Sequence, residues 1–177
     1  MFVPGIIITI LTFPGVIVHE FAHQLFCRLF GVAIFEVKYF QIANPAGYVI
    51  HEIPRNPVHQ LVISIGPFIV NSLLALIIAF PAAIPVSQFK SGTLLDYALL
   101  YLGLRIAMHA FPSLGDAKSM WQILWHGENT PLWLKILAVP VAGLIMIGAL
   151  GSFFWLDLAY GIFVSIGLPR ILVGLFA

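Results

Sequence analysis

The sequence predicts an all-α polytopic membrane protein: a single integral domain with about five transmembrane helices and a small β-hairpin after the first. Of the 177 residues, 61% are hydrophobic and 8% are charged, whereas soluble domains carry about 25% charged residues. The apolar residues also fall into long runs, which are typical of membrane helices. The net charge of +1 gives no reason to expect nucleic acid as a partner.

The first predicted span covers residues 3–30, which is long enough to cross a bilayer. Pro14 and Gly15 are expected to kink it, because proline removes an intrahelical hydrogen bond. A short amphipathic helix is predicted at residues 116–126, and its tryptophans suit the membrane interface. The remaining spans are predicted at residues 57–84, 93–110, 132–150 and 153–175, with a break near residues 151–157.

A small hairpin is predicted at residues 34–53. Phe35, Val37 and Tyr39 alternate with charged residues, which favours a strand. The segment 44–47, Asn-Pro-Ala-Gly, is a turn signal before a return strand. Two roles are open for this hairpin: a linker, or a sheet edge that pairs with an extended substrate by β-augmentation.

The basic residues predict the orientation in the membrane. With five spans, seven of the eight Lys and Arg residues fall on one side and only Lys90 falls on the other. Because cytoplasmic loops carry the excess of Lys and Arg, we expect a cytoplasmic hairpin and C-terminus and an outside N-terminus. The protein is expected in the cell membrane of a prokaryote. The seven residues are Arg28, Lys38, Arg55, Arg105, Lys118, Lys135 and Arg170.

His19, Glu20 and His23 form the pattern H-E-x-x-H inside the first span. On a helix, residues i and i+4 share a face, so His19 and His23 can point two imidazoles at one metal ion. Two neutral imidazoles suit zinc, and the neighbouring Glu20 can take a proton from a zinc-bound water. Ionisable residues within a membrane usually mark a functional site. The pattern therefore predicts the zinc site of a metallopeptidase.

A catalytic zinc usually takes three protein ligands and leaves the fourth position to water. His109 and Asp116 flank a break with proline and glycine that follows the third predicted span. Non-helical backbone at membrane depth is tolerated only where it is buried in protein or lines a wet cavity. Asp116 and His109 are therefore both candidates for the third ligand, and His109 is the alternative if Asp116 does not bind the metal.

These residues resemble the site-2 protease family of intramembrane zinc metallopeptidases. In that family a membrane helix carries H-E-x-x-H, and a later segment carries Asn-x-x-Pro followed by Leu-Asp-Gly, whose Asp is the third zinc ligand. Here residues 109–116 match the second motif loosely. His109 stands where the family has Asn, the Asp is one residue closer to the proline, and Gly115 and Asp116 are in reversed order. The chain is similar to a compact, divergent member over about residues 3–117.

Gly66-Pro67 followed by Asn71 also resembles an element of the family's intervening segment. The resemblance implies a metalloendopeptidase that cleaves membrane proteins or membrane-associated peptides near the cytoplasmic side. Zinc would be held by the two histidines and Asp116, Glu20 would be the general base, and Asn71 would position the peptide or the oxyanion.

Three other functions are consistent with parts of the sequence. A catalytically inactive protease homologue would keep the fold without the reaction. A metal carrier or channel could use polar residues on broken membrane helices. A membrane di-iron desaturase or hydroxylase would use the H-x-x-x-H pattern of His19 and His23, but such sites need more clustered histidines than the six present here.

Overall fold

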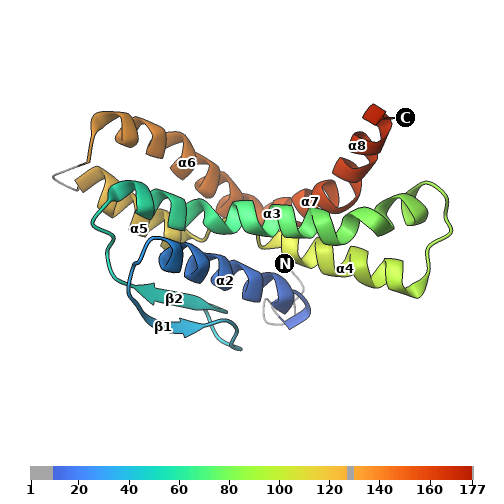
Figure 1. Cartoon of the computed structure of the whole chain (residues 1–177), viewed down its shortest axis with the longest axis horizontal. Helices are drawn as coiled ribbons and strands as arrows, with labels where there is room; N and C mark the ends of the chain where they lie inside the picture. Colours follow the sequence, from blue (N-terminus) through green and yellow to red (C-terminus); the bar gives the residue numbers. More distant parts are fainter. Residues whose placement is uncertain (1–9, 127–129, 177) are drawn as a thin grey trace.

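The computed structural model describes residues 10–126 and 130–176, and it is mostly helical with one β-hairpin after the first described helix (Figure 1). Residues 3–9 of the first predicted span lie outside the described residues. The elements in chain order are α2 (Phe13–Leu29), β1 (Ile34–Lys38), β2 (Tyr48–His51), α3 (Pro57–Ser87), α4 (Leu94–Met108), α5 (Leu114–His126), α6 (Leu132–Gly151), the 3-10 helix η1 (Ser152–Phe154), α7 (Leu156–Ile162), the π-helix η2 (Phe163–Gly167) and α8 (Leu168–Phe176).

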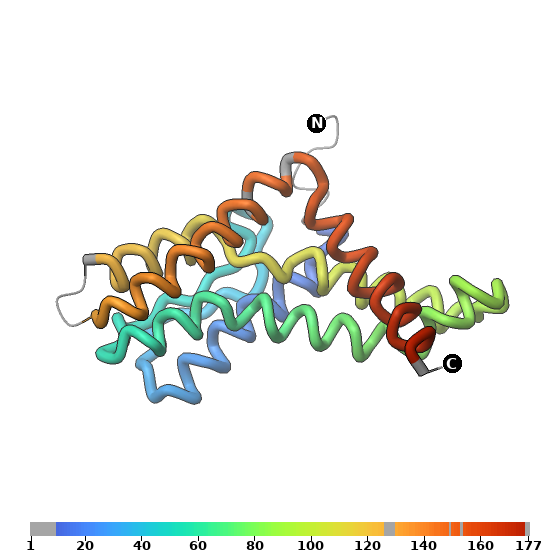
Figure 2. Tube along the Cα trace, turned by 90° about the horizontal axis from the view of Figure 1, so that it is seen from above, coloured from blue at the N-terminus to red at the C-terminus, as the bar shows by residue number. Residues whose placement is uncertain are grey.

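The long helix α3 lies at the centre, and α2, α4, α5 and the C-terminal segment all pack against it (Figure 1). The turned view in Figure 2 shows α5 and α6 beside the first half of α3, and α4 beside the second half. Small residues bring α3 and α4 close together. A Cβ on Gly103 would lie 2.8 Å from the Cβ of Ala79 and 2.9 Å from the carbonyl oxygen of Ala75. Such contacts between small residues are typical of packed membrane helices.

The hairpin is confirmed. β1 and β2 pair antiparallel, with Val37 opposite Val49 and Lys38 opposite Tyr48, and an irregularity lies between Ile34 and Glu36. The Tyr48 hydroxyl donates a hydrogen bond of 2.5 Å to the Glu36 carboxylate, and this bond raises the pKa of Tyr48. The cross-strand bond adds to the backbone pairing between the two strands, and both strands pack beside α2.

Two described helical stretches are long and apolar enough to cross a membrane, Pro57–Phe89 and Leu156–Leu175. The stretch Leu132–Gly148 is apolar but shorter. α4 has 15 residues, about 22 Å of helix, whereas the hydrocarbon core of a bilayer is about 30 Å thick. Helix length therefore does not support five full crossings, and that number stays a prediction.

Three local expectations can be compared with the helix bounds. An interruption is present near Pro14, since residues 10 and 11 are helical and Thr12 is not. Pro14 lies in the first turn of α2, where its missing N–H is not needed. The helix predicted from residue 116 begins at Leu114, so Asp116 lies in its first turn rather than in a loop. The predicted break near residues 151–157 is present, and Trp155 forms it with a φ of +61° between η1 and α7.

Candidate metal centre

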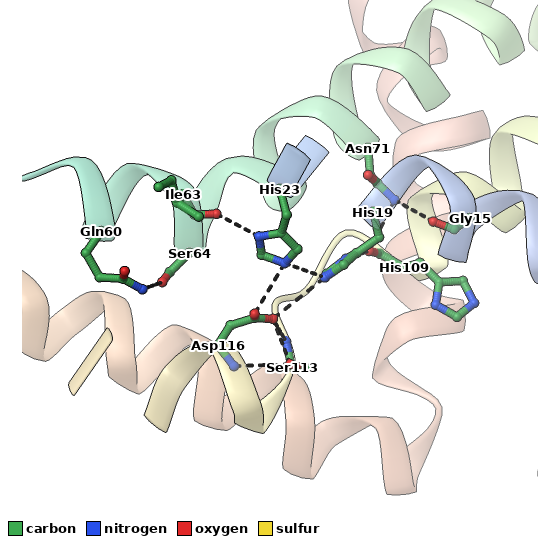
Figure 3. A network of polar contacts seen from close by, with 10 residues as sticks. All are labelled: Gly15, His19, His23, Gln60, Ile63, Ser64, Asn71, His109, Ser113 and Asp116. Atoms are coloured by element: carbon green, nitrogen blue, oxygen red, sulfur yellow. Dashed lines mark hydrogen bonds and ion pairs between the residues drawn. The ribbon is translucent and has the colours of Figure 1, made fainter. Parts of the chain in front are cut away.

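α2 turns its H-E-x-x-H residues into the protein. His19, Glu20 and His23 are 8%, 8% and 5% exposed, and the two imidazole rings lie with their centroids 4.9 Å apart. His19 Nδ1 donates to the carbonyl oxygen of His109 at 2.7 Å, and His23 Nδ1 donates to the carbonyl oxygen of Ile63 at 3.0 Å (Figure 3). Because a carbonyl oxygen only accepts, each Nδ1 carries the hydrogen and each Nε2 of the neutral ring keeps a free lone pair.

The two carbonyl groups are available because of the local sequence. In an α-helix the Ile63 carbonyl would accept from the residue four positions later. That residue is Pro67, which has no N–H, so the carbonyl is free for His23. His109 caps the C-terminus of α4, where the last carbonyls have no intrahelical partner. A proline and a helix end thus orient the two rings.

Asp116 comes from the first turn of α5. Its Oδ1 lies 3.2 Å from His23 Nε2, and its Oδ2 lies 3.7 Å from His19 Nε2. Ser113 fixes the carboxylate, since its backbone N–H and its hydroxyl both donate to Oδ2 at 2.7 Å. The Asp116 N–H in turn donates to the Ser113 hydroxyl at 3.2 Å. This reciprocal pattern is that of a capping box, so the cap of α5 also aims the carboxylate at the two rings.

The three side chains fit a bound cation. The two Nε2 atoms lie 3.2 Å apart, although both carry lone pairs when the Nδ1 atoms carry the hydrogens. The Asp116 carboxylate adds a third electron donor, and such groups repel one another unless a cation lies among them. The group of His19, His23 and Asp116 can therefore hold a metal ion, and one ligand atom from each lies within 4.8 Å of the others.

A cavity of about 540 Å³ opens beside this group. His23, Asp116 and Glu20 line it together with residues of α3, α5 and the hairpin. The Glu20 side chain lies against Gly47 at the start of the return strand. A Cβ on Gly47 would lie 2.6 Å from Glu20 Cγ and 3.0 Å from Glu20 Oε1. Glu20 thus shares one cavity with two of the candidate ligands.

The return strand β2 forms one wall of the cavity. Tyr48, Val49 and His51 all line it. Consecutive side chains of a strand point to opposite faces, so lining by both Tyr48 and Val49 means that β2 presents its edge to the cavity. β1 pairs with the other edge. The strand therefore has one edge free on the side of the candidate site.

The alternative ligand and the predicted substrate residue lie elsewhere. The ring of His109 points away from the group, and its Nε2 lies 2.8 Å from the hydroxyl of Thr12 (Figure 3). Asn71 is fully buried and does not line the cavity. Its Nδ2 is shared among the carbonyl oxygens of Gly15, Ile106 and His109 at 3.1 to 3.2 Å. Asn71 therefore ties α2, α3 and α4 together, and its expected role in binding substrate stays a prediction.

Among the residues that the structure describes, His19, His23 and Asp116 are the one group of three that can hold a metal ion. His51 lines the cavity, and its Nδ1 lies 2.7 Å from the carbonyl oxygen of Glu52. His59 stacks on Phe30 with ring centroids 4.2 Å apart. The described part of the chain thus forms no second histidine cluster of the kind that a di-iron site needs.

Sequence reasoning missed three contributors to the site. The Ser-x-x-Asp spacing of Ser113 and Asp116 is a recognisable cap signal, and it could have placed Asp116 on a helix. The carbonyl of Ile63 had an indirect signal in the position of Pro67. Gln60, which also lines the cavity, had none, because a single Gln in an apolar helix does not indicate which way its amide points.

No protein-family model, no curated protein and no solved structure matches this chain.

Proposed function

We propose that the protein is an integral membrane zinc metalloendopeptidase that cleaves membrane proteins or membrane-associated peptides near the cytoplasmic face. The observation that carries this proposal is the convergence of His19, His23 and Asp116 beside Glu20 in one cavity. The resemblance to site-2 proteases rests on the same residues. A compact, divergent member of that family would use them as zinc ligands and general base.

Zinc is the metal that the donor set favours. Two imidazole nitrogens and one carboxylate are three ligands of the types that zinc accepts, and catalytic zinc sites use three protein ligands with water in the fourth position. The Nδ1 hydrogen bonds of His19 and His23 orient the rings as metal-bound histidines require. The carboxylate of Asp116 is held by Ser113, so all three ligands are fixed before the metal binds.

A bound zinc ion would supply a water of lowered pKa and a Lewis acid for the scissile carbonyl. Glu20 accepts the proton from the attacking water and then delivers it to the leaving amine. Its buried position against Gly47 holds the carboxylate at the cavity wall. Reaction at this depth requires that water enters from the side of the hairpin, where polar residues line the cavity.

The free edge of β2 is suited to hold a substrate in extended form. A protease needs an exposed peptide backbone, and a helical membrane segment must unwind to offer it. Pairing with a sheet edge supplies main-chain hydrogen bonds to the unwound segment. Of the two roles open for the hairpin, substrate binding is therefore favoured over a linker.

A membrane location is supported by the long apolar helices and by their exposed faces. Along α3, Ile69, Leu73, Ile77 and Phe80 are 42%, 55%, 68% and 38% exposed, and their spacing places them on one side of the helix. Soluble proteins rarely expose such a continuous apolar stripe. The bias of Lys and Arg then favours a cytoplasmic hairpin and C-terminus.

The test is Glu20→Gln in the full chain, purified in detergent beside wild type. We expect both proteins to bind one zinc ion, and only wild type to hydrolyse a quenched fluorescent peptide library in a manner that a zinc chelator blocks. Glu52→Gln, at an exposed Glu outside the cavity, is the matched control and is expected to stay active. Full activity of Glu20→Gln would refute the base assignment, and wild type without stoichiometric zinc would refute the proposal.

The same preparation separates a protease from a metal carrier. In sealed vesicles we expect zinc to stay with the protein rather than to exchange across the membrane. Zinc uptake into the vesicles without any proteolysis would favour the carrier instead. Zinc binding without either activity would favour an inactive homologue.

A further inference from the structure

Gln60 is a buried polar side chain in the cavity whose carbonyl oxygen has no partner. It lies in the first turn of α3 and is only 1% exposed. Its side chain lines the cavity together with His23 and Asp116, and Figure 3 shows it on α3 beside Ser64. The Oε1 atom makes no hydrogen bond. A buried amide oxygen without a partner costs free energy, so this oxygen needs a hydrogen-bond donor, and the described residues supply none.

Two serines hold the amide of Gln60 in place. Its Nε2 donates to the hydroxyl of Ser64 at 3.2 Å and to the hydroxyl of Ser119 at 3.3 Å. Both serines also line the cavity. Because these bonds use both hydrogens of the amide nitrogen, the oxygen is left as the free end of the group. Contacts from two helices, α3 and α5, therefore fix the direction of Gln60.

An extended peptide in this cavity would need such a partner. A strand directs its N–H and C=O groups alternately to its two edges. Pairing with β2 would therefore give hydrogen-bond partners to the groups on only one edge of the substrate strand. The groups on the other edge are buried by the remaining walls, which α3 and α5 provide. A backbone N–H that is buried without a partner is costly. The unpartnered oxygen of Gln60 is an acceptor on one of these walls.

We infer that Gln60 binds a backbone N–H of the peptide substrate, with Ser64 and Ser119 as positioning residues for its amide. This subsite rests on the proposed function, since it assumes that a peptide occupies the cavity. Binding at this subsite does not depend on the side chains of the substrate. The subsite therefore recognises the unwound backbone itself, which distinguishes an extended segment from a helical one.

The test compares two zinc-binding probes on the zinc-loaded full chain in detergent. One is a short peptidyl hydroxamate, which has a peptide backbone, and the other is acetohydroxamate, which has none. We expect Gln60→Met to weaken the peptidyl hydroxamate about tenfold, the effect of one buried hydrogen bond, and to leave acetohydroxamate and zinc content unchanged. Calorimetry measures the affinity of the peptidyl hydroxamate directly and the affinity of acetohydroxamate by competition with it.

Two further variants complete the experiment. Ser119→Ala frees the amide to rotate and should weaken the peptidyl probe by about threefold, which tests the idea even where Gln60→Met does not fold. Ser165→Ala removes another buried, unpartnered hydroxyl that lies outside the cavity, and it should change neither probe.

Three results would count against the subsite. Equal affinity of the peptidyl probe for wild type and Gln60→Met overturns the subsite. That result is expected if the Oε1 atom of Gln60 accepts a hydrogen bond from water alone. An equal loss of both probes also overturns it, because the effect would then lie at the metal. Wild type that binds neither zinc nor hydroxamate overturns the proposed function, and the subsite with it.

Discussion

Gly15→Ala is expected to weaken metal binding although Gly15 contacts no candidate ligand directly. Gly15 is buried where α2 crosses α4. A Cβ at residue 15 would lie 2.2 Å from the carbonyl oxygen of Arg105, 1.2 Å short of the 3.4 Å at which ordinary contact begins. It would also lie 2.6 Å from Cδ2 of the buried His109 ring. The obstacle at Arg105 is backbone, so α2 must move away from α4 by about 1 Å.

That shift acts on the orientation of His19. The bond from His19 Nδ1 to the His109 carbonyl is 2.7 Å long, and a movement of about 1 Å takes it past the limit of a hydrogen bond. Loss of such an orienting bond typically weakens metal affinity by about 10- to 100-fold. Overpacking itself should lower the free energy of unfolding by about 1–3 kcal/mol.

The assay is a competition titration with a chromophoric zinc chelator, combined with denaturant unfolding of the same samples. Gly143→Ala is the matched control, because a Cβ there meets nothing within 4 Å. It should leave zinc affinity unchanged. If Gly15→Ala binds zinc within twofold of wild type while its stability falls, the crossing of α2 and α4 supports the fold without orienting His19, and the expected link to metal binding is refuted.

Other substitutions test the remaining parts of the site. Asp116→Ala should abolish stoichiometric zinc binding while His109→Ala keeps it; the opposite result in metal analysis would reassign the third ligand. Gly47→Ala should press on Glu20 and lower peptide turnover roughly tenfold or more, with zinc content unchanged; unchanged turnover would place Glu20 out of reach of the hairpin. Ser113→Ala should cost about 1 kcal/mol of unfolding free energy, as loss of a helix cap does, and should weaken zinc binding. Unaltered stability in the denaturant titration and unaltered zinc affinity in the chelator titration would argue against this role of the cap.

The parts of the site that were predicted correctly depend on local spacing. His19 and His23 are four residues apart, and any helix places such residues on one face. The hairpin is also local, since alternation and a turn signal lie within one short segment. Asp116 was preferred over His109 because of a resemblance, and the structure brings the Asp116 carboxylate to the two rings.

The parts that could not be predicted depend on contacts between distant segments. Asn71 reads as a polar residue in an apolar helix, which suits a substrate site as well as a structural one. Only the approach of α2 and α4 shows that its amide serves three backbone carbonyls. The number of spans stays a prediction for a related reason: apolar runs show that helices are buried in some apolar medium, but not whether that medium is lipid or neighbouring helices such as α3 and α4.

The helix-breaking residues around the site share one physical role. Pro67 leaves the Ile63 carbonyl free for His23, and the end of α4 leaves the His109 carbonyl free for His19. Each candidate ring is thus held by a backbone oxygen that a regular helix would have used itself. A backbone acceptor cannot titrate and has no rotamers, so it fixes the tautomer more rigidly than a side chain would. In a chain with so few charged residues, carbonyl groups left free at a proline and at a helix end orient the candidate metal ligands.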